Sequence, residues 1–127
     1  MTKKSIFIST DYNNSQVRVL DIEGHAVNLE LAILRDVDTQ KNRPRFRQAL
    51  NRIGYDIGRI IVQELINEDF MVNEVTTPLG TAEQLSYAKE PVLLSIIRAS
   101  IPMCDGMQRA FPYAETGIVS ASREHGH

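Results

Sequence analysis

The chain has 127 residues and a formal net charge of −2, and it is 43% hydrophobic and 24% charged, as in an ordinary globular domain. This near-neutral balance excludes a protein whose whole surface attracts nucleic acid or an anionic membrane. No apolar run approaches the ~20 residues of a membrane span, and the N-terminus lacks the apolar core of a secretory signal. Cys104 is the single cysteine, so no intrachain disulfide can form and a reducing, cytoplasmic location is expected.

Residues 1–25 are predicted to form an N-terminal arm or hairpin. The segments "SIFIS" and "QVRVL" alternate like strands, and "DYNNS" between them is turn-like. The same pattern fits an arm that packs on another subunit. Residues 26–127 are expected to form the main domain.

Two helices are predicted next. Residues 26–36 place apolar side chains on one face, and the polar stretch "RDVDTQKN" then breaks the pattern. Residues 43–67 carry one apolar stripe at spacings of three and four, with Asn42 as the N-cap. Gly54 and Gly58 each cost about 1 kcal/mol of helix propensity. We therefore expect another element to pack closely against them.

"MVNEVTT" indicates a strand that ends in the turn "TPLG".

The last third of the chain predicts a separate strand–helix–strand unit. The continuous apolar run Val92–Ile97 favours a parallel strand buried on both faces. A helix over residues 102–110 and a strand over 117–122 follow, and the unit of about 30 residues has the length of a βαβ motif.

Two arginines, Arg98 and Arg123, come just past the carboxyl ends of these two strands. In open α/β sheets that edge is where ligands bind. Neighbouring strands lie ~4.8 Å apart, so two guanidinium groups can converge on one anion, and arginine suits phosphate. Backbone amides at the start of the following helix would favour the same charge. The alternative is that each arginine pairs with a local carboxylate, for which Asp105, Glu115 and Glu124 are available.

The start of the long helix is basic, because it contains Arg43, Arg45, Arg47, Arg52 and Arg59. Cations near a helix N-terminus oppose the helix dipole, so an anionic partner is one interpretation. A solvated or subunit-facing side is the preferred one. No run of aromatic residues accompanies these arginines for base stacking, and no nucleic-acid partner is expected.

Several segments resemble the uracil phosphoribosyltransferases, in the same order along the chain. They are "LAILRDVDTQ", "PRFRQALNRIGYDIGRIIVQEL", "TPLG", "VLLSIIRASIPMCDGM" and "FPYAETGIVSASR". The resemblance implies an α/β fold, with a type I phosphoribosyltransferase-like parallel sheet flanked by helices. It implies transfer of a phosphoribosyl group from 5-phosphoribosyl-1-pyrophosphate to uracil in pyrimidine salvage, with Mg2+ bound through the sugar diphosphate. A homo-oligomer, a dimer or higher, is also implied.

The strongest match is "IIRAS", where the family typically has Leu-Arg-Ala-Gly. The resemblance implies that Arg98 and Arg123 bind phosphoribosyl pyrophosphate, chiefly its pyrophosphate side. Ser100 departs from the family's glycine, which is expected to tighten or shift the turn. No catalytic residue and no metal ligand is identified in this portion.

The family's phosphoribosyl-binding loop and its uracil-binding segment are not found in these residues. We expect the chain to represent the N-terminal part of such an enzyme and to be inactive alone. The strands should then expose apolar surface and an open edge. Two other classes stay open: a binding or regulatory protein that keeps the two-arginine site, and an oligomerisation domain without a ligand.

Overall fold

The computed structural model describes residues 7–9, 16–18, 20 and 26–123. Strands β1 (Phe7–Ser9) and β2 (Gln16–Arg18) pair antiparallel, with Phe7 opposite Arg18. This is the pairing that a hairpin requires. The other residues of the two predicted strand segments lie outside the described residues except Leu20, and the division of the chain at residue 25 stays a prediction.

Three helices follow in the order α2 (Val27–Arg35), α3 (Val37–Lys41) and α4 (Arg43–Glu68). The first and third agree with the sequence to within a residue at each end. The short α3 was not predicted, because its sequence is polar and has no apolar stripe. It begins because the Asp36 carboxylate accepts a hydrogen bond from the amide two residues later, at 2.8 Å. Asn42 caps α4 as predicted, and its Oδ1 accepts from the amide three residues later at 3.3 Å.

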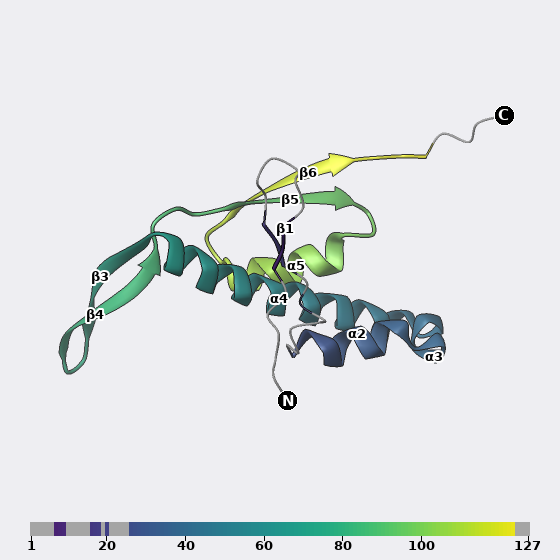
Figure 1. Ribbon diagram of the computed structural model, residues 1–127, viewed down its shortest axis with the longest axis horizontal. Coiled ribbons are helices and arrows are strands. Elements are labelled where there is room, and N and C mark those ends of the chain that lie inside the picture. The colour runs from purple at the N-terminus through teal and green to yellow at the C-terminus, as the bar shows by residue number, and fades with distance from the viewer. Residues whose placement is uncertain (1–6, 10–15, 19, 21–25, 124–127) are drawn as a thin grey trace.

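The strand–helix–strand unit is confirmed. It consists of β5 (Val92–Ile97), α5 (Ile101–Ala110) and β6 (Glu115–Ser120). The two strands pair in parallel, and the last pair in the register is Ile97 with Ser120. β5 has the predicted bounds, whereas β6 begins and ends two residues earlier than predicted. The carboxyl ends of both strands therefore meet at one edge (Figure 1).

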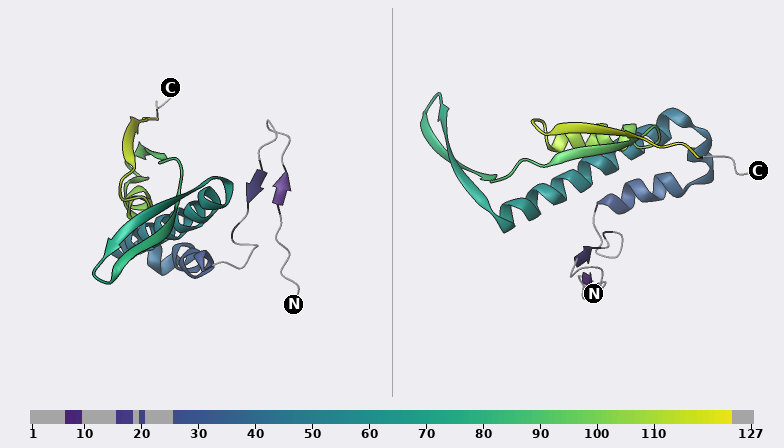
Figure 2. Two further views of the ribbon diagram at one scale, coloured as in Figure 1. Left: turned by 90° about the vertical axis from the view of Figure 1, so that its left-hand side faces the viewer. Right: turned by 90° about the horizontal axis from the view of Figure 1, so that it is seen from above.

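Strands β3 (Phe70–Thr77) and β4 (Gly80–Tyr87) form an antiparallel hairpin, in register from Phe70 opposite Tyr87 to the turn. The turn "TPLG" was predicted, and Gly80 has a φ of 134°, which glycine adopts without strain. β4 was missed. Most of its side chains are exposed, so its sequence carries no apolar alternation. The hairpin projects from the end of α4, away from the other strands (Figures 1 and 2).

The predicted close packing at the helix glycines is confirmed. A Cβ atom added at Gly54 would lie 2.0 Å from the carbonyl oxygen of Met103, and one at Gly58 would lie 2.6 Å from the side chain of the last α5 residue. In the other direction, a Cβ at Gly106 would lie 1.8 Å from the carbonyl oxygen of Asn51. Helices α4 and α5 are thus in direct backbone contact.

A small core forms where the unit meets α4. Leu93, Ala110, Phe111 and Ala114 are buried together. The Phe111 ring meets that of Tyr87 edge-on, with centroids 5.7 Å apart. This contact ties the base of the hairpin to the strand–helix–strand unit.

The prediction that β5 is buried on both faces is wrong. Leu93 and Ser95 are buried, whereas Val92, Leu94 and Ile96 remain 67%, 64% and 56% exposed. The helices α4 and α5 cover only one face of the β5–β6 pair (Figure 2). The continuous apolar run indicated a two-sided environment, but within the described residues nothing packs on the second face. The expectation of exposed apolar surface is met here.

Among the described residues, no helix is both long and apolar enough to cross a membrane.

Candidate anion-binding groove

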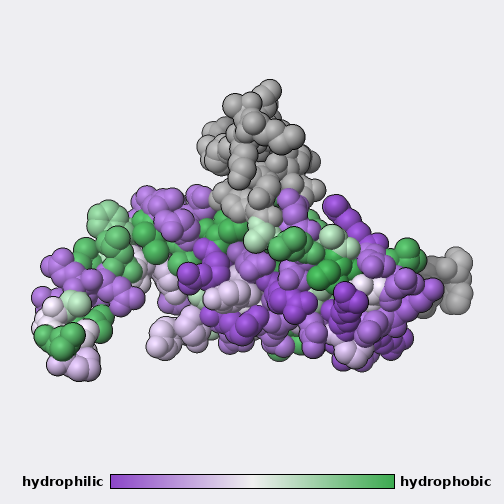
Figure 3. Space-filling view, turned by 90° about the horizontal axis from the view of Figure 1, so that it is seen from below, coloured by the Kyte–Doolittle hydropathy of each residue, from purple (hydrophilic) through white to green (hydrophobic). Residues whose placement is uncertain are grey.

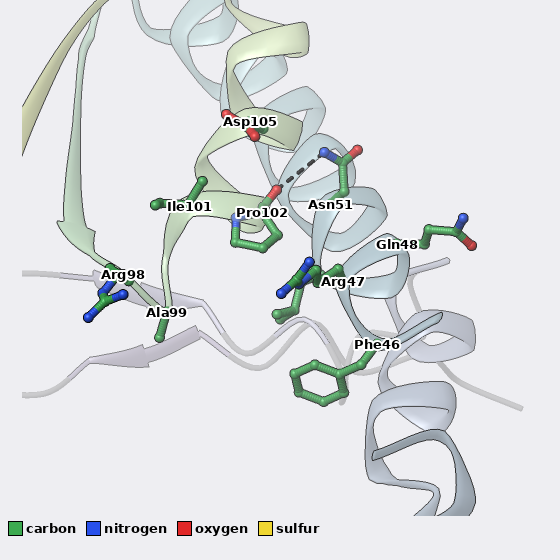
Figure 4. A pocket seen from close by; sticks show the side chains of 10 residues that line it. Phe46, Arg47, Gln48, Asn51, Arg98, Ala99, Ile101, Pro102 and Asp105 are labelled. Atoms are coloured by element: carbon green, nitrogen blue, oxygen red, sulfur yellow. Dashed lines mark hydrogen bonds between the residues drawn. The ribbon is translucent and has the colours of Figure 1, made fainter. Parts of the chain in front are cut away.

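A groove of about 740 Å³ separates the beginning of α4 from the turn that joins β5 to α5. Figure 4 shows its walls: one comes from α4, with Phe46 and Arg47, and the other from the turn, with Arg98. Its size lies within the range of small-molecule sites. The groove lies at the carboxyl edge of β5, where the sequence predicted an anion site.

Arg98 is the first residue after β5, and the peptide bond that joins it to Ile97 is cis. Its side chain is exposed and lines the groove. Within residues 26–123 it forms no ion pair with Asp105 or Glu115, although Asp105 lines the same groove. Glu124 lies outside the described residues. For Arg98, the alternative of a local salt bridge therefore has no support within the described residues.

Arg123 lies three residues after β6 and is exposed. It shares the carboxyl edge of the sheet with Arg98, because the two strands are parallel neighbours. The two arginines are not equivalent in position, since Arg98 follows its strand directly. Within the described lining of the groove, Arg98 is present and Arg123 is not.

Ser100 fixes the turn that carries Arg98. Its hydroxyl oxygen lies 2.7 Å from that of Ser95, and it also donates to the backbone carbonyl of Ile96. The backbone amide of Ile101 donates to the Arg98 carbonyl at 3.2 Å. The residue that departs from the family's glycine is therefore tied back to β5 through its hydroxyl, a contact that glycine cannot make.

The start of α5 offers fewer free amides than expected. The Ile101 amide is used within the turn, Pro102 has no N–H, and the Cys104 amide donates to the Ser100 carbonyl at 2.9 Å. Met103 alone keeps an uncommitted amide among these first positions. An anion in the groove would depend mainly on side chains rather than on the helix dipole.

Asn51 connects the walls of the groove. Its side-chain nitrogen donates to the Pro102 carbonyl at 3.3 Å, and its Oδ1 accepts from Arg109 at 2.5 Å (Figure 4 shows the first contact). The Arg109 guanidinium also lies over the Tyr55 ring, 4.8 Å from its centroid. These contacts, together with the glycine packing, hold α4 at a fixed distance from α5.

Arg47 was not selected as a site residue from the sequence, yet it lines the groove with Arg98. It lies on α4 beside Phe46, and both come from the "RFR" segment. The unfavourable placement of cations near a helix N-terminus was the one signal for it. That signal did not distinguish Arg47 from its basic neighbours, because only the fold shows which of them faces the turn.

A second charged cluster lies away from the groove, between α2 and α4. Arg52 Nε pairs with Glu30 Oε1 at 2.9 Å, while Glu30 Oε2 is buried without a hydrogen-bond partner in the described structure. Burial raises the pKa of the Asp56 carboxyl, and the negative charge of Glu30 raises it further. Arg109 and Arg52 act in the opposite direction. This cluster joins two helices, and none of its members lines the groove.

Among the described residues, no three of the His, Cys, Asp and Glu side chains gather in a way that could hold a metal ion. Asp105 is the one carboxylate in the described lining of the groove. Its neighbours there include two arginines, which favour a bound anion.

The fold and the groove together define a class of protein. It is an α/β protein with a phosphoribosyltransferase-like parallel unit and a cationic groove at its carboxyl edge. Comparison with known proteins is more specific. The family model for uracil phosphoribosyltransferase matches residues 22–127. The chain belongs to the uracil phosphoribosyltransferase family.

Curated relatives agree with this assignment. The chain is 36% identical over 110 residues to the uracil phosphoribosyltransferase of Porphyromonas gingivalis, covering 84% of this chain and 48% of the relative. It is 34% identical over 97 residues to that of Haloarcula marismortui, covering 75% and 41%. The chain thus spans about half the length of these relatives. A solved structure of the AQ2163 protein from Aquifex aeolicus is similar with a TM-score of 0.54, covering 75% of this chain and 44% of that one. At 21% identity this likeness shows the fold alone.

Proposed function

We propose that the chain forms the pyrophosphate-binding part of a uracil phosphoribosyltransferase. The reaction converts uracil and 5-phosphoribosyl-1-pyrophosphate into uridine monophosphate and pyrophosphate. One observation supports this most: Arg98 lines a groove at the carboxyl edge of a parallel strand without an ion pair to a described carboxylate. In this proposal Arg98 and Arg123 bind the donor on its pyrophosphate side.

The groove's charge suits the expected chemistry. The bond between the anomeric carbon and the pyrophosphate oxygen breaks, the carbon passes through an oxocarbenium-like state, and uracil N1 forms the new bond as it loses its proton. Negative charge grows on the departing pyrophosphate. Arginine side chains beside it would stabilise that charge more in the transition state than in the ground state. The role of the Ser100 turn is to hold Arg98 in place for this contact.

Mg2+ is proposed as the metal that accompanies the diphosphate. Magnesium is commonly bound through substrate phosphates and one or two carboxylates, and Asp105 is the carboxylate that the described part of the groove provides. The metal would neutralise part of the donor's charge. Asp105 is then the residue of this chain that would face it.

Binding of pyrophosphate tests the proposal directly. Isothermal titration of the 127-residue chain with pyrophosphate and with phosphoribosyl pyrophosphate should show binding, and Arg98→Ala should weaken it. Loss of one charged hydrogen-bonding partner costs about 1.5–3 kcal/mol, or roughly ten- to a hundred-fold. Arg59→Ala is a matched control, since Arg59 is exposed on α4 and does not line the groove. Equal affinities for the parent chain and Arg98→Ala would contradict the proposal.

We also propose that the protein is a homo-oligomer. Large apolar side chains are exposed on the hairpin and on the open face of the β5–β6 pair, including Phe70, Leu85, Leu94 and Ile96. Figure 3 shows apolar side chains gathered on the hairpin, at the left of the view. Such exposed patches are typical of interaction surfaces. Sedimentation at several protein concentrations tests this, and a monomer throughout would contradict it. We also propose that the protein is cytoplasmic, because its single cysteine cannot form an intrachain disulfide.

A further inference from the structure

The groove brings together two cations from elements far apart in the sequence. Arg98 belongs to the turn after β5, and Arg47 is the fifth residue of α4. Both are exposed and both line the groove. Figure 4 shows the Arg47 side chain directed from α4 toward the turn that carries Arg98 and Ala99. Two like charges that face one cavity repel each other, so an anion between them would be stabilised.

Among the described residues, the surroundings of Arg47 leave its charge uncompensated. The first turn of α4 contains no acidic residue and instead contains Arg43 and Arg45, although a helix N-terminus favours negative charge. Arg52, five residues further along the helix, is neutralised by Glu30 at 2.9 Å. Arg47 has no such carboxylate partner in the described part of the chain.

Asp105 limits where an anion can lie. It is the one carboxylate in the groove's described lining, and in Figure 4 it lies toward the opposite end of the groove from Arg47 and Phe46. An anion without a bound metal is repelled by that end and attracted by the other. The apolar wall of Phe46 and Pro102 lowers the local dielectric constant. A charge contact made beside that wall is therefore stronger than the same contact in water.

We propose that Arg47 binds the diphosphate group of the phosphoribosyl donor together with Arg98. This inference rests on the proposed function, and it adds a binding residue from α4 to the two arginines of the sheet edge. The guanidinium of Arg47 would donate to the diphosphate oxygens from the side of the groove opposite Arg98. The diphosphate would thereby connect α4 to the β5–α5 turn.

Titration of variants of the 127-residue chain tests the inference, with pyrophosphate and phosphoribosyl pyrophosphate as probes. Arg47→Ala should weaken both about tenfold, and Arg47→Lys should weaken them less, because lysine keeps the charge and loses the planar fork. Arg45→Ala is the matched control: Arg45 is exposed on the same helix two residues earlier and does not line the groove. It should change the affinities by less than about twofold.

The outcomes separate this inference from the proposed function. If Arg98→Ala weakens pyrophosphate binding and Arg47→Ala does not, the inference is wrong and the proposed function stands. If neither variant matters, both are wrong. Should Arg47→Ala weaken the phosphoribosyl donor but not pyrophosphate, the contact is with another part of the donor and the diphosphate assignment fails. Arg47→Gln, which keeps most of the side chain, and a circular dichroism spectrum of each variant exclude misfolding as the cause.

Discussion

The hydroxyl oxygens of Ser95 and Ser100 lie 2.7 Å apart, the first buried on β5 and the second in the turn that follows it. Ser100 also donates to the Ile96 carbonyl. The pair closes a loop in which four residues, Arg98 among them, lie between the two serines. The turn is therefore held by side chains as well as by its backbone.

Removal of the Ser100 hydroxyl should destabilise the chain. Ser100→Ala leaves the buried Ser95 hydroxyl without this partner, at a cost of about 1–3 kcal/mol. Chemical denaturation measures the loss. Ser95→Ala and the double variant complete a thermodynamic cycle, in which the two changes should be less than additive. Full additivity would mean that the two hydroxyls do not interact.

A side chain at Gly106 should destabilise the packing of α5 on α4. Gly106→Ala places a Cβ atom 1.8 Å from the Asn51 carbonyl oxygen, so α5 must move away from α4. Overpacking of this kind costs about 1–3 kcal/mol, which exceeds the gain of about 1 kcal/mol in helix propensity. Gly117→Ala is the control, since its Cβ would meet only the flexible end of Leu94 at 3.0 Å. A Gly106→Ala chain as stable as the parent in thermal melts would show that the helices are further apart than described.

The raised pKa of Asp56 predicts a dependence of stability on pH. Its carboxyl takes up a proton more readily in the folded chain than in the unfolded one, so ionisation disfavours folding. The contribution is most favourable below the ordinary pKa of 3.8 and is lost as the pH rises through the higher folded pKa. Asp56→Asn should therefore stabilise the chain at pH 7, by roughly 0.5 kcal/mol because the site is partly solvated. Near pH 3 the two should be equally stable. A variant less stable than the parent at pH 7 would show that Arg52 and Arg109 dominate.

Two glutamates face each other on the hairpin. Glu74 and Glu83 are directly paired in the register of β3 and β4, and both are exposed. Like charges in that position are destabilising, so Glu83→Lys should stabilise the hairpin by about 0.2–1 kcal/mol. Hydrogen exchange of the hairpin amides measures this locally. Gln84→Lys, opposite the neutral Asn73, is the control. Faster exchange in Glu83→Lys than in the parent would indicate that the glutamate pair contacts a cation, as an oligomer interface could provide.

The sequence predicts those elements whose local pattern of apolar residues, caps and turns determines their structure. The helix at residues 43–67 followed from its apolar stripe and the Asn42 cap, and the parallel unit followed from its continuous apolar run and its length of about 30 residues. The glycine packing at Gly54 followed because a helix interior otherwise disfavours glycine. Strand β4 (Gly80–Tyr87) could not be predicted from the sequence, because an exposed strand needs no apolar alternation.

Of the two arginines that line the groove, the sequence predicted one as a site residue and not the other. Arg98 could be placed because the end of a parallel strand has a known relation to ligand sites. Arg47 could not, because its role depends on the direction in which α4 crosses the turn, and that direction is set by tertiary packing. Burial on both faces of β5 was also predicted wrongly, since an apolar run does not show whether a second layer is present.

The backbone contact at Gly54 and Gly106 fixes the position of α4 against α5. The helix has 26 residues, or about 39 Å of length at 1.5 Å per residue, and it extends from the groove to the base of the hairpin. The contact lies between these ends and nearer to Arg47 than to Phe70. Because α5 begins at the turn that carries Arg98 and α4 carries Arg47, the spacing of the two helices at these glycines also sets the width of the groove.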